Sequence, residues 1–542
     1  AQSERFFPDH RRSISGDYPN HFLDPFEGKE EENKKSRRGM RNVLLVFISC
    51  MPFLASAQIP EGYQHWDALT RTAVAIHNSE AHHSNIRPLS PFLDTLEVSF
   101  TRDSALISGP KTFRFRLSPV VDLNGGFSAA PNLGVAGFGN AGIQIQAFLK
   151  ERFYARASYQ LAYTYFPDHL QVFSKNELVI PGIGKAEEMN GGYIAHYYTG
   201  ALGMKMGDHF ELELGRDKHF WGDGYRSMIL SNNASPFPYM RLTTKVWKFK
   251  YTNLWTALTD LNPVTGEERR KFTTQHALSW NITQRFNLSI YEAVVWQASD
   301  SLSDRGFEAA YLNPLIFYRP VEFSQGSADN VLLGISMRYE LEDNIQLYSQ
   351  LYFDEFLMNE LRQGNGWWGN KFGFQIGAKA YDLFADSLSL QTELNIARPY
   401  TYTHGSVVQA YGHMNQSLAH PLGTNFIEWI SRASYQTTNF TYNGTFMFAG
   451  FGQDKEGENY GGDVFVSYAS PTKVYGNNIM QGEKNTLLFL HLEAEKQVIK
   501  ALNINLTAGL GVRKVFNTIG APMDAWLTLG LRSPLVRNYR DF

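Results

Sequence analysis

Long segments of this chain alternate between apolar and polar positions with a period of two. The segment 272–282 places Phe272, Leu278 and Trp280 on one set of alternate positions, while the other set is mostly polar. A short turn at 283–285 follows, and the alternation then resumes. Successive side chains of a β-strand point to opposite faces, so this pattern predicts two antiparallel strands that share one apolar face. Three more hairpins of this kind are predicted within 331–354, 371–396 and 488–513.

Two features favour a membrane barrel over a soluble β-sandwich or β-helix. The predicted strands span about 10 to 13 residues, the length that a tilted strand needs to cross a membrane, whereas soluble strands usually have about 5 or 6. Short turns on one side and long loops on the other are typical of outer-membrane barrels. We therefore predict an all-β fold, a closed antiparallel transmembrane β-barrel of about 18 strands over residues 111–542. Its long connections are expected at 217–240, 297–330, 355–370 and 398–424.

The composition agrees with a barrel and excludes several other classes. Aromatic residues make up 14% of the 542 residues, which fits aromatic girdles at the two membrane interfaces. The formal net charge of -3 argues against a nucleic-acid partner, which requires a basic excess. The chain has a single cysteine, Cys50, which excludes a disulfide scaffold and a cysteine metal site.

The N-terminal part carries an export signal. Residues 43–57 form a long apolar run, basic residues precede it, and Ala55-Ser56-Ala57 offers a small-residue cleavage site. This arrangement predicts a signal peptide over 40–57 that is cleaved after Ala57, with an uncleaved N-terminal anchor as the alternative. Residues 1–39 are polar and lack periodicity, and we interpret them as a leader upstream of the true start at Met40.

Export together with a barrel predicts a location in the outer membrane, in contact with its lipid. Residues 58–110 are expected to form an N-terminal periplasmic segment with a short helix around 66–76. This segment is expected either to stay on the periplasmic side or to tuck into the barrel.

The stretch 215–238 combines aromatic, charged and amide side chains, with Gly222 and Gly224 on either side of Asp223. Sugar recognition uses such a mixture, because rings stack on the apolar faces of sugars while planar polar groups bind the hydroxyls. The alternative is a loop that folds into the barrel mouth and pairs its polar groups with one another, and the two interpretations are compatible. The candidate glycan ligands are Arg216, Asp217, His219, Trp221, Asp223, Tyr225, Asn232 and Asn233.

Catalysis has weak support in the sequence. Asp217, His219 and Ser231 could be imagined as a triad and His413 with His420 as metal ligands, but residues of these types fall this close together by chance in most long chains. The sequence contains neither a G-x-S-x-G elbow nor an H-E-x-x-H motif. We therefore predict no enzyme activity, no metal and no cofactor. Three further polar and aromatic stretches lie at 311–330, 348–371 and 399–425.

At these stretches the chain resembles the capsule-assembly Wzi family, most of all a Bacteroidetes-type branch that includes proteins similar to gliding-motility RemB. The resemblance covers about 110–530 and is carried by FWGDGYRSMILSNNASPFPYMRL, LNPLIFYRP, LYSQLYFDEF, WWGNKFGFQIGAKAY and LAHPLGTN. The matching motif positions are Trp221, Gly222, Gly224, Ser231, Asn232, Asn233, Pro236 and Pro238. The resemblance implies an 18-stranded outer-membrane barrel that binds capsular or extracellular polysaccharide.

The resulting hypothesis is a non-catalytic, lectin-like barrel that helps to attach or assemble surface polysaccharide. In it, Trp221 and Tyr225 stack on sugar rings, while neighbouring charged and amide groups supply directional hydrogen bonds. Three alternatives stay open: a porin or transport channel, a subunit of a gliding or secretion machine, and an outer-membrane hydrolase. The oligomeric state is left undetermined by the sequence.

Overall fold

The computed structural model describes residues 83–93, 113–129, 134–150, 152–165, 167–299, 305–315, 329–502, 504–517, 520, 523–533 and 541. The predicted signal peptide at 40–57, the leader at 1–39 and the predicted helix around 66–76 lie outside the described residues. In the described part of the chain, no helix is both long enough and apolar enough to cross a membrane.

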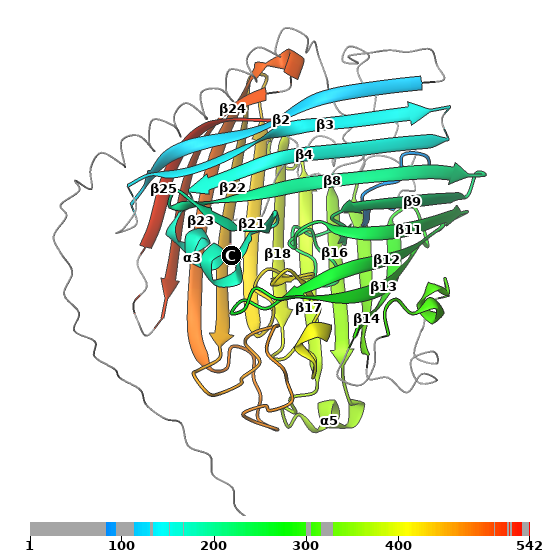
Figure 1. Cartoon of the computed structure of the whole chain (residues 1–542), viewed down its shortest axis with the longest axis vertical. Helices are drawn as coiled ribbons and strands as arrows, with labels where there is room; N and C mark the ends of the chain where they lie inside the picture. The colour runs from blue at the N-terminus through cyan, green and yellow to red at the C-terminus, as the bar shows by residue number, and fades with distance from the viewer. Residues whose placement is uncertain are drawn as a thin grey trace, which may run out of the picture. The chain divides into compact units, whose positions relative to one another are not determined.

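Eighteen of the described strands form a closed antiparallel barrel, which confirms the predicted fold and strand number (Figure 1). They are β2 (Phe113–Ser128), β3 (Ala136–Leu149), β4 (Phe153–Tyr165), β8 (Gly192–Met206), β9 (Phe210–Asp217), β11 (Phe237–Val246), β12 (Phe249–Leu261), β13 (Glu268–Asn281), β14 (Phe286–Gln297), β15 (Asn330–Glu342), β16 (Ile345–Glu355), β17 (Lys371–Tyr381), β18 (Leu388–Ala397), β21 (Phe426–Gln436), β22 (Phe440–Gln453), β23 (Glu483–Ile499), β24 (Ile504–Phe516) and β25 (Met523–Arg532).

Each of these strands pairs with its neighbours in chain order, and β2 closes the barrel against β25 with Asp122 opposite Arg532. Short elements occupy the loops: β1 (Ile86–Arg87), α3 (Asp168–Glu177), β5 (Val179–Ile180), β6 (Gly184–Lys185), β7 (Glu187–Met189), β10 (Phe220–Trp221), the 3-10 turn η3 (Ala309–Leu312), α5 (Met358–Gln363), η4 (Val407–Gln409), β19 (Gly412–His413), β20 (Gln416–Ser417) and η5 (Lys500–Leu502). Of these, β7 extends the wall by pairing with β8.

The two ends of the barrel differ as the sequence predicts. The turns between β11 and β12, β13 and β14, and β15 and β16 are short and lie at one end, whereas the long connections after β9, β14, β16, β18 and β22 begin at the other. Outer-membrane barrels place short turns in the periplasm and long loops outside the cell. Exposed aromatic residues gather on the outer wall near the short turns, as an interfacial girdle requires: Phe113, Phe153, Phe210, Trp247, Trp280, Tyr339, Tyr435, Phe440 and Tyr442.

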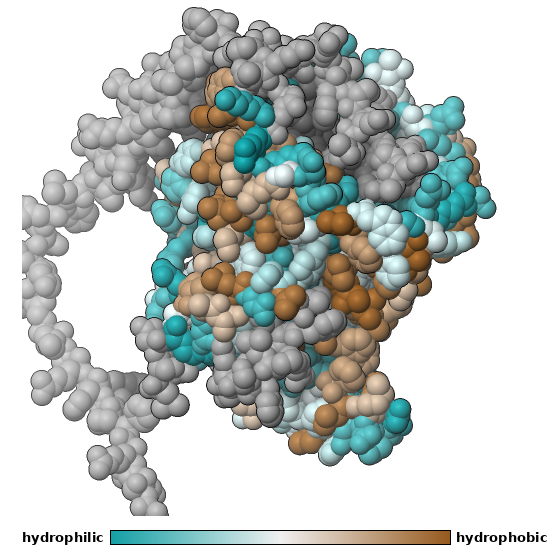
Figure 2. All heavy atoms as spheres, turned by 90° about the vertical axis from the view of Figure 1, so that its right-hand side faces the viewer, coloured by the Kyte–Doolittle hydropathy of each residue, from teal (hydrophilic) through white to brown (hydrophobic). Residues whose placement is uncertain are grey.

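The outer and inner faces of the wall carry different side chains. Many outward positions expose large apolar side chains, and Figure 2 shows apolar patches of this kind on one face of the molecule. Inward positions of the same strands bury polar side chains, such as Gln275 on β13 and Gln350 on β16. The alternation in the sequence therefore separates a lipid-facing surface from a surface that faces the lumen.

The lumen contains a packed core in addition to these polar side chains. Apolar inward residues such as Leu254, Ala277 and Leu332 form one hydrophobic cluster with residues that the loops bring into the barrel, including Met228 and Tyr402. The small and apolar inward positions are scattered along several strands. These positions form one core only together with the loops that fold into the barrel.

Because the outer face of the wall meets lipid, the same substitution is expected to lower the free energy of unfolding by different amounts at two depths. Leu202 is 66% exposed on the outer face of β8, four positions from its periplasmic end at Met206, so Leu202→Arg is expected to destabilise the barrel by about 2–4 kcal/mol. Phe127, which is 71% exposed at the long-loop end of β2, is the control, and Phe127→Arg is expected to cost about 0–1 kcal/mol. Urea unfolding in lipid vesicles measures both. Equal costs would contradict the placement of the membrane.

Candidate functional site

The connection between β9 and β11, residues 218–236, enters the lumen, and we call it the plug loop. Its strand β10 pairs with β1 of the N-terminal segment. Trp221 is only 1% exposed, and its ring stacks on Tyr291 of β14 with the centroids 5.7 Å apart. Gly222 has a φ of +148°, and a Cβ atom there would lie 2.5 Å from Nε2 of Gln350 on β16. The plug loop therefore packs closely against the inner wall.

Arg226 fixes the plug loop to another part of the wall. Its guanidinium is fully buried, with nitrogen–oxygen distances of 3.4 Å to Glu428 on β21 and 3.1 Å to Asp541. Glu428 also lies 2.6 Å from Nε2 of His420, and the backbone N–H of Arg226 donates to Glu393 on β18 at 3.0 Å. Buried charges are costly unless they are paired, so this network holds the loop in one position.

The connection between β18 and β21, residues 398–425, lies against the plug loop, and we call it the cap loop. The hydroxyl of Tyr402 donates to the carbonyl of Met228 at 2.7 Å, and the N–H of Ser231 donates to the carbonyl of Leu418 at 2.7 Å. The wall also binds the cap loop, because the ammonium of Lys271 donates to a cap-loop carbonyl at 2.8 Å. The two loops therefore form one interlocked body.

Burial favours the neutral form of two titratable groups of these loops. Burial lowers the pKa of His413 to about 3, and the nearby cations Arg216 and Lys271 add to the effect. Its Nδ1 accepts the N–H of Thr259 at 3.0 Å, which requires the unprotonated nitrogen. Burial lowers the pKa of Lys218 to about 7, although Asp217 acts in the opposite direction.

The described N-terminal segment, 83–93, lies inside the barrel. The amide of Asn85 donates to Ser289 at 2.7 Å and to the hydroxyl of Tyr291 at 3.0 Å, both on inward positions of β14. The guanidinium of Arg241 on β11 donates to the carbonyl of Pro88 at 2.7 Å. Of the two placements that the sequence leaves open, this part of the segment takes the one within the barrel.

Most of the predicted glycan ligands, which lie on the plug loop and at the end of β9, are buried and paired. Asp217 lies 3.1 Å from Arg156, and Asp223 lies 3.5 Å from Arg338. The ring of His219 packs edge-on against Tyr239, with the centroids 4.4 Å apart. In this conformation Trp221 offers no exposed face to a sugar, because its ring is covered by the packed core.

The remaining predicted ligands differ from one another in burial and in location. Asn233 is buried and donates to the carbonyl of Ser417 at 3.0 Å, whereas Asn232 is half-buried. Tyr225 is also half-buried, and its hydroxyl donates to Asp541 at 2.8 Å. Arg216 faces outward on β9, where its guanidinium lies 4.4 Å from the ring centroid of Tyr198, so the structure separates it from the other seven residues.

A second aromatic and cationic group lies at the long-loop end, and we call it the mouth cluster. Trp368 lies 4.9 Å from Tyr468 and 5.8 Å from Trp367, measured between ring centroids, and all three rings are half-buried. The ammonium of Lys371 lies 4.4 Å from the ring centroid of Tyr468, and the guanidinium of Arg398 donates to the carbonyl of Trp367 at 3.4 Å. Rings that are half-buried and backed by cations form a rigid surface with exposed edges.

The sequence pattern indicates part of this cluster but not Tyr468. Trp367, Trp368 and Lys371 lie in a stretch that was singled out for its aromatic residues. Tyr468 was missed because it lies far along the chain in the connection 454–482. The available signal was the recurrence of tyrosines in that connection, at 460, 468 and 475.

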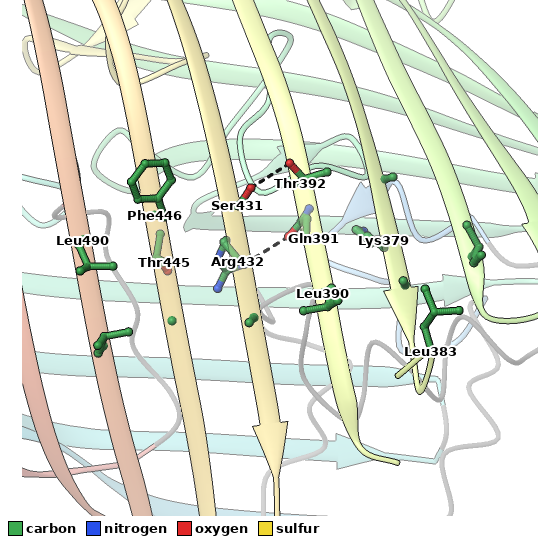
Figure 3. A pocket seen from close by; sticks show the side chains of 16 residues that line it. Lys379, Leu383, Leu390, Gln391, Thr392, Ser431, Arg432, Thr445, Phe446 and Leu490 are labelled. Atoms are coloured by element: carbon green, nitrogen blue, oxygen red, sulfur yellow. Dashed lines mark hydrogen bonds between the residues drawn. The ribbon is translucent and has the colours of Figure 1, made fainter. Parts of the chain in front are cut away.

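A cavity of about 570 Å³ lies on the barrel wall rather than among the loops (Figure 3). Outward-facing Leu390, Phe446 and Leu490 line it, together with the hydroxyls of Thr392 and Ser431, which lie 3.0 Å apart. Because this part of the wall faces lipid, the cavity suits an acyl chain better than a polysaccharide.

The chain matches known proteins in its family and in its fold. Residues 137–519 match the family described as capsule assembly protein Wzi. Among solved structures, the chain is similar to Wzi of Escherichia coli, described as an outer membrane protein involved in group 1 capsule assembly and a carbohydrate-binding β-barrel. The two are 13% identical with a TM-score of 0.52, and the match covers 88% of this chain and 98% of that one.

Two Pseudomonas aeruginosa barrels are also similar. OprD is 9% identical with a TM-score of 0.43, over 77% of this chain and 94% of that one. OccK1 (OpdK) is 8% identical with a TM-score of 0.44, over 77% of this chain and 98% of that one. No curated protein sequence matches the chain.

Loss of Arg226 is expected to loosen the plug loop. Arg226→Ala leaves Glu428 and Asp541 buried without their cation, which destabilises the plugged state by about 3–5 kcal/mol. We expect steady ion conductance in planar bilayers for this variant and none for the unmodified protein. Arg285→Ala is the control, since Arg285 pairs with Asp343 at an exposed turn. Conductance equal to that of the unmodified protein would contradict the assigned role.

Acidification is expected to destabilise the cap loop through His413. Its pKa is 6.5 when free and about 3 in the folded loop, so the unfolded state binds more protons between these values and stability rises with pH across that window. His413→Gln is expected to flatten this dependence, and His209→Gln, at an exposed turn, is expected to leave it unchanged. The urea midpoint of tryptophan fluorescence, measured across this pH range, checks both outcomes.

Proposed function

The chain belongs to the capsule assembly protein Wzi family, and we propose that it binds surface polysaccharide and helps to attach or assemble it at the outer membrane. The proposed role is lectin-like and non-catalytic, with capsular or extracellular polysaccharide as the ligand. The family match and the mouth cluster together support it. Wzi of E. coli is described as a carbohydrate-binding barrel, and carbohydrate binding is the activity that we propose here.

We propose the mouth cluster as the main binding surface. Trp367, Trp368 and Tyr468 present partly exposed rings at the extracellular end, where polysaccharide has access. Arg398 adds positive charge beside the rings, whereas the buried ammonium of Lys371 is balanced by the carboxylates of Asp354 and Glu355, which lie 3.2 and 3.4 Å from it. The single observation that carries the proposal is this half-buried ring group, already fixed by its own contacts.

The predicted glycan ligands on the plug loop and at the end of β9 have a different proposed role. Tyr225 and Asn232 keep exposed area and stay candidate sugar contacts. Asp217, His219, Trp221, Asp223 and Asn233 are proposed to support the site by fixing the loops. Since the loops and the wall share one packed core, a porin with an open lumen is the less favoured function.

The energetics require several contacts at once. A hydrogen bond to a sugar contributes about 1 kcal/mol after desolvation, so one contact gives little affinity. A polysaccharide repeats its unit, and simultaneous or rapidly repeated engagement of repeats raises the apparent affinity without new contacts. The proposal therefore implies weak binding of single repeats and stronger binding of long chains.

The route to the membrane is also a proposal. We propose that residues 40–57 act as a signal peptide that is cleaved after Ala57, with residues 1–39 upstream of the start. The basic residues before 43–57 and the small residues at its end support this. The relation to the gliding-motility branch rests on the sequence motifs alone.

If polysaccharide binds at the mouth cluster, removal of one of its aromatic rings is expected to lower the affinity. Trp368→Ala and Tyr468→Ala are each expected to weaken binding of the surface polysaccharide of the bacterium that makes the protein about tenfold, equivalent to about 1.4 kcal/mol. Tyr468→Phe is expected to retain most of the affinity, because the ring that stacks is kept. Calorimetry or a glycan array with the purified barrel measures the change.

The matched control is Trp247→Ala, since Trp247 is 74% exposed at the opposite end of the barrel. Unchanged binding in both mouth variants would remove the mouth cluster as the site. Absence of any polysaccharide binding by the unmodified barrel would overturn the proposed function itself.

A further inference from the structure

The cavity of about 570 Å³ on the outer wall lies mainly over β17, β18, β21, β22 and β23, and we call it the wall hollow (Figure 3). Small outward side chains form much of its floor: Ala378 and Ala380 on β17, and Ala433 opposite Gly444 on β21 and β22. Among the described residues, a Cβ atom at Gly444 would meet only Cδ2 of Leu492, at 3.4 Å, so the hollow is open over this position. Larger apolar side chains surround the floor: Leu383, Leu390, Phe446, Leu490 and Leu492.

The wall hollow is on the lipid side of the wall. The guanidinium of Arg432 faces the lumen, where it lies 4.1 Å from the ring centroid of Tyr225 on the plug loop. Because successive side chains of a strand point to opposite faces, its neighbours Ser431 and Ala433, which line the hollow, point outward.

The depth of the wall hollow places it in the periplasmic leaflet. Tyr435 and Tyr442 are opposite each other near the short turns and belong to the periplasmic girdle. Ala433 and Ser431 lie on β21 between Tyr435 and the membrane centre. With about 3.3 Å per residue and a tilt near 40°, they are about 5 and 10 Å into an apolar band about 25 Å tall.

Trp429 borders the wall hollow on the side of the membrane centre. It follows Ser431 at the next outward position of β21, and its side chain is 47% exposed. Its Nε1 donates to the hydroxyl of Thr392 at 2.9 Å, and its ring packs edge-on against Phe446 with the centroids 5.7 Å apart. The hydroxyls of Thr392 and Ser431 bind each other at 3.0 Å. The polar groups at this edge therefore have partners within the protein, and an apolar ligand can lie against them.

At its other edge the wall hollow reaches the membrane surface, at the turn 382–387 between β17 and β18. Leu383 belongs both to this turn and to the lining. The turn also carries Asp382 and Asp386, which are exposed and form no ion pair within the described part of the chain. The exposed Lys496 lies on β23, three strands away from β18, which is about 14 Å. The charge nearest to the opening is therefore negative, which favours a ligand with an ammonium group over an anionic one.

Lipid covers the whole outer wall, but lipid tails are as apolar as leucine, so only close packing or polar contacts retain one lipid longer than its neighbours. The wall hollow surrounds a chain on several sides, and each additional contact adds dispersion attraction. We propose that the wall hollow binds one phospholipid of the periplasmic leaflet, whose acyl chain fills the hollow and whose ammonium-bearing head group lies beside Asp382 and Asp386. This site is separate from the mouth cluster and does not depend on polysaccharide binding there.

Native mass spectrometry of the purified barrel in mild detergent tests the acyl-chain site. With phosphatidylethanolamine added, the unmodified barrel is expected to retain one lipid. Ala433→Leu with Gly444→Leu fills the hollow and is expected to raise the dissociation constant of this lipid about tenfold. Ala508→Leu, at an exposed outward position of β24 outside the lining, is the control.

Heat-modifiable migration in gels checks that each variant barrel is folded, and Ala433→Leu alone is measured if the double variant does not fold. Equal retention by the filled and unmodified barrels, or an equal loss in the control, would contradict the proposed site.

The choice of head group has its own test. Phosphatidylethanolamine and phosphatidylglycerol with the same acyl chains are compared in the same measurement, and the unmodified barrel is expected to bind the former about fivefold more tightly. Asp382→Asn with Asp386→Asn is expected to remove this preference while one lipid is still retained. Tighter binding of phosphatidylglycerol, or an unchanged preference in the variant, would overturn the assigned head group.

Photo-crosslinking in intact cells shows what occupies the wall hollow in the membrane. With p-benzoylphenylalanine in place of Leu390, ultraviolet light is expected to give an adduct that carries one phospholipid, with a higher share of phosphatidylethanolamine than at Leu529. The position of Leu529, 61% exposed on the outer face of β25, reports the ordinary lipid around the barrel. The same lipid composition at both positions, or a crosslink at 390 to a second copy of the chain or to another protein, would overturn the proposal.

Discussion

The structure depends on the fact that each wall strand must satisfy two environments through alternate side chains. Outward positions meet lipid, so they carry residues such as Leu202, whereas inward positions meet folded loops and carry residues such as Gln275 and Gln350. Closure of β2 against β25 pairs the backbone around the whole ring, so that none of the eighteen described wall strands has an open edge in the membrane. With the wall fixed in this way, the long loops are free to carry function at one end.

The packed lumen determines where a ligand can bind. Trp221 and Met228 of the plug loop and Tyr402 of the cap loop share one hydrophobic cluster with the wall, much as residues do in the core of a soluble protein. Arg226 adds a buried charge that is stable only in this arrangement, because Glu428 and Asp541 must lie beside it. The plug loop thus makes the filled lumen rigid. The half-buried rings of Trp367, Trp368 and Tyr468, at the long-loop end, provide the proposed contact surface.

Local pattern was sufficient to predict the wall but not the arrangement of the loops. The predicted turn at 283–285 lies between the end of β13 at Asn281 and the start of β14 at Phe286, because a period of two and a tight turn are both local signals. Contacts between Trp221 and Tyr291, or between Trp368 and Tyr468, join residues that are about 70 to 100 positions apart and leave no local signal. Thr274 and His276 did interrupt the apolar set of β13, and that interruption marks the part of the wall covered by residues 305–315.

Hydroxyl-radical footprinting of the purified barrel, with and without the surface polysaccharide of the bacterium that makes it, shows whether the polysaccharide binds at the mouth cluster or within the lumen. Bound polysaccharide is expected to protect Trp367, Trp368 and Tyr468 from oxidation, while Trp221 is oxidised slowly in both states because it is buried. A change at Trp221 and Tyr225 with none at the mouth cluster would contradict the account, since it would place the polysaccharide within the lumen.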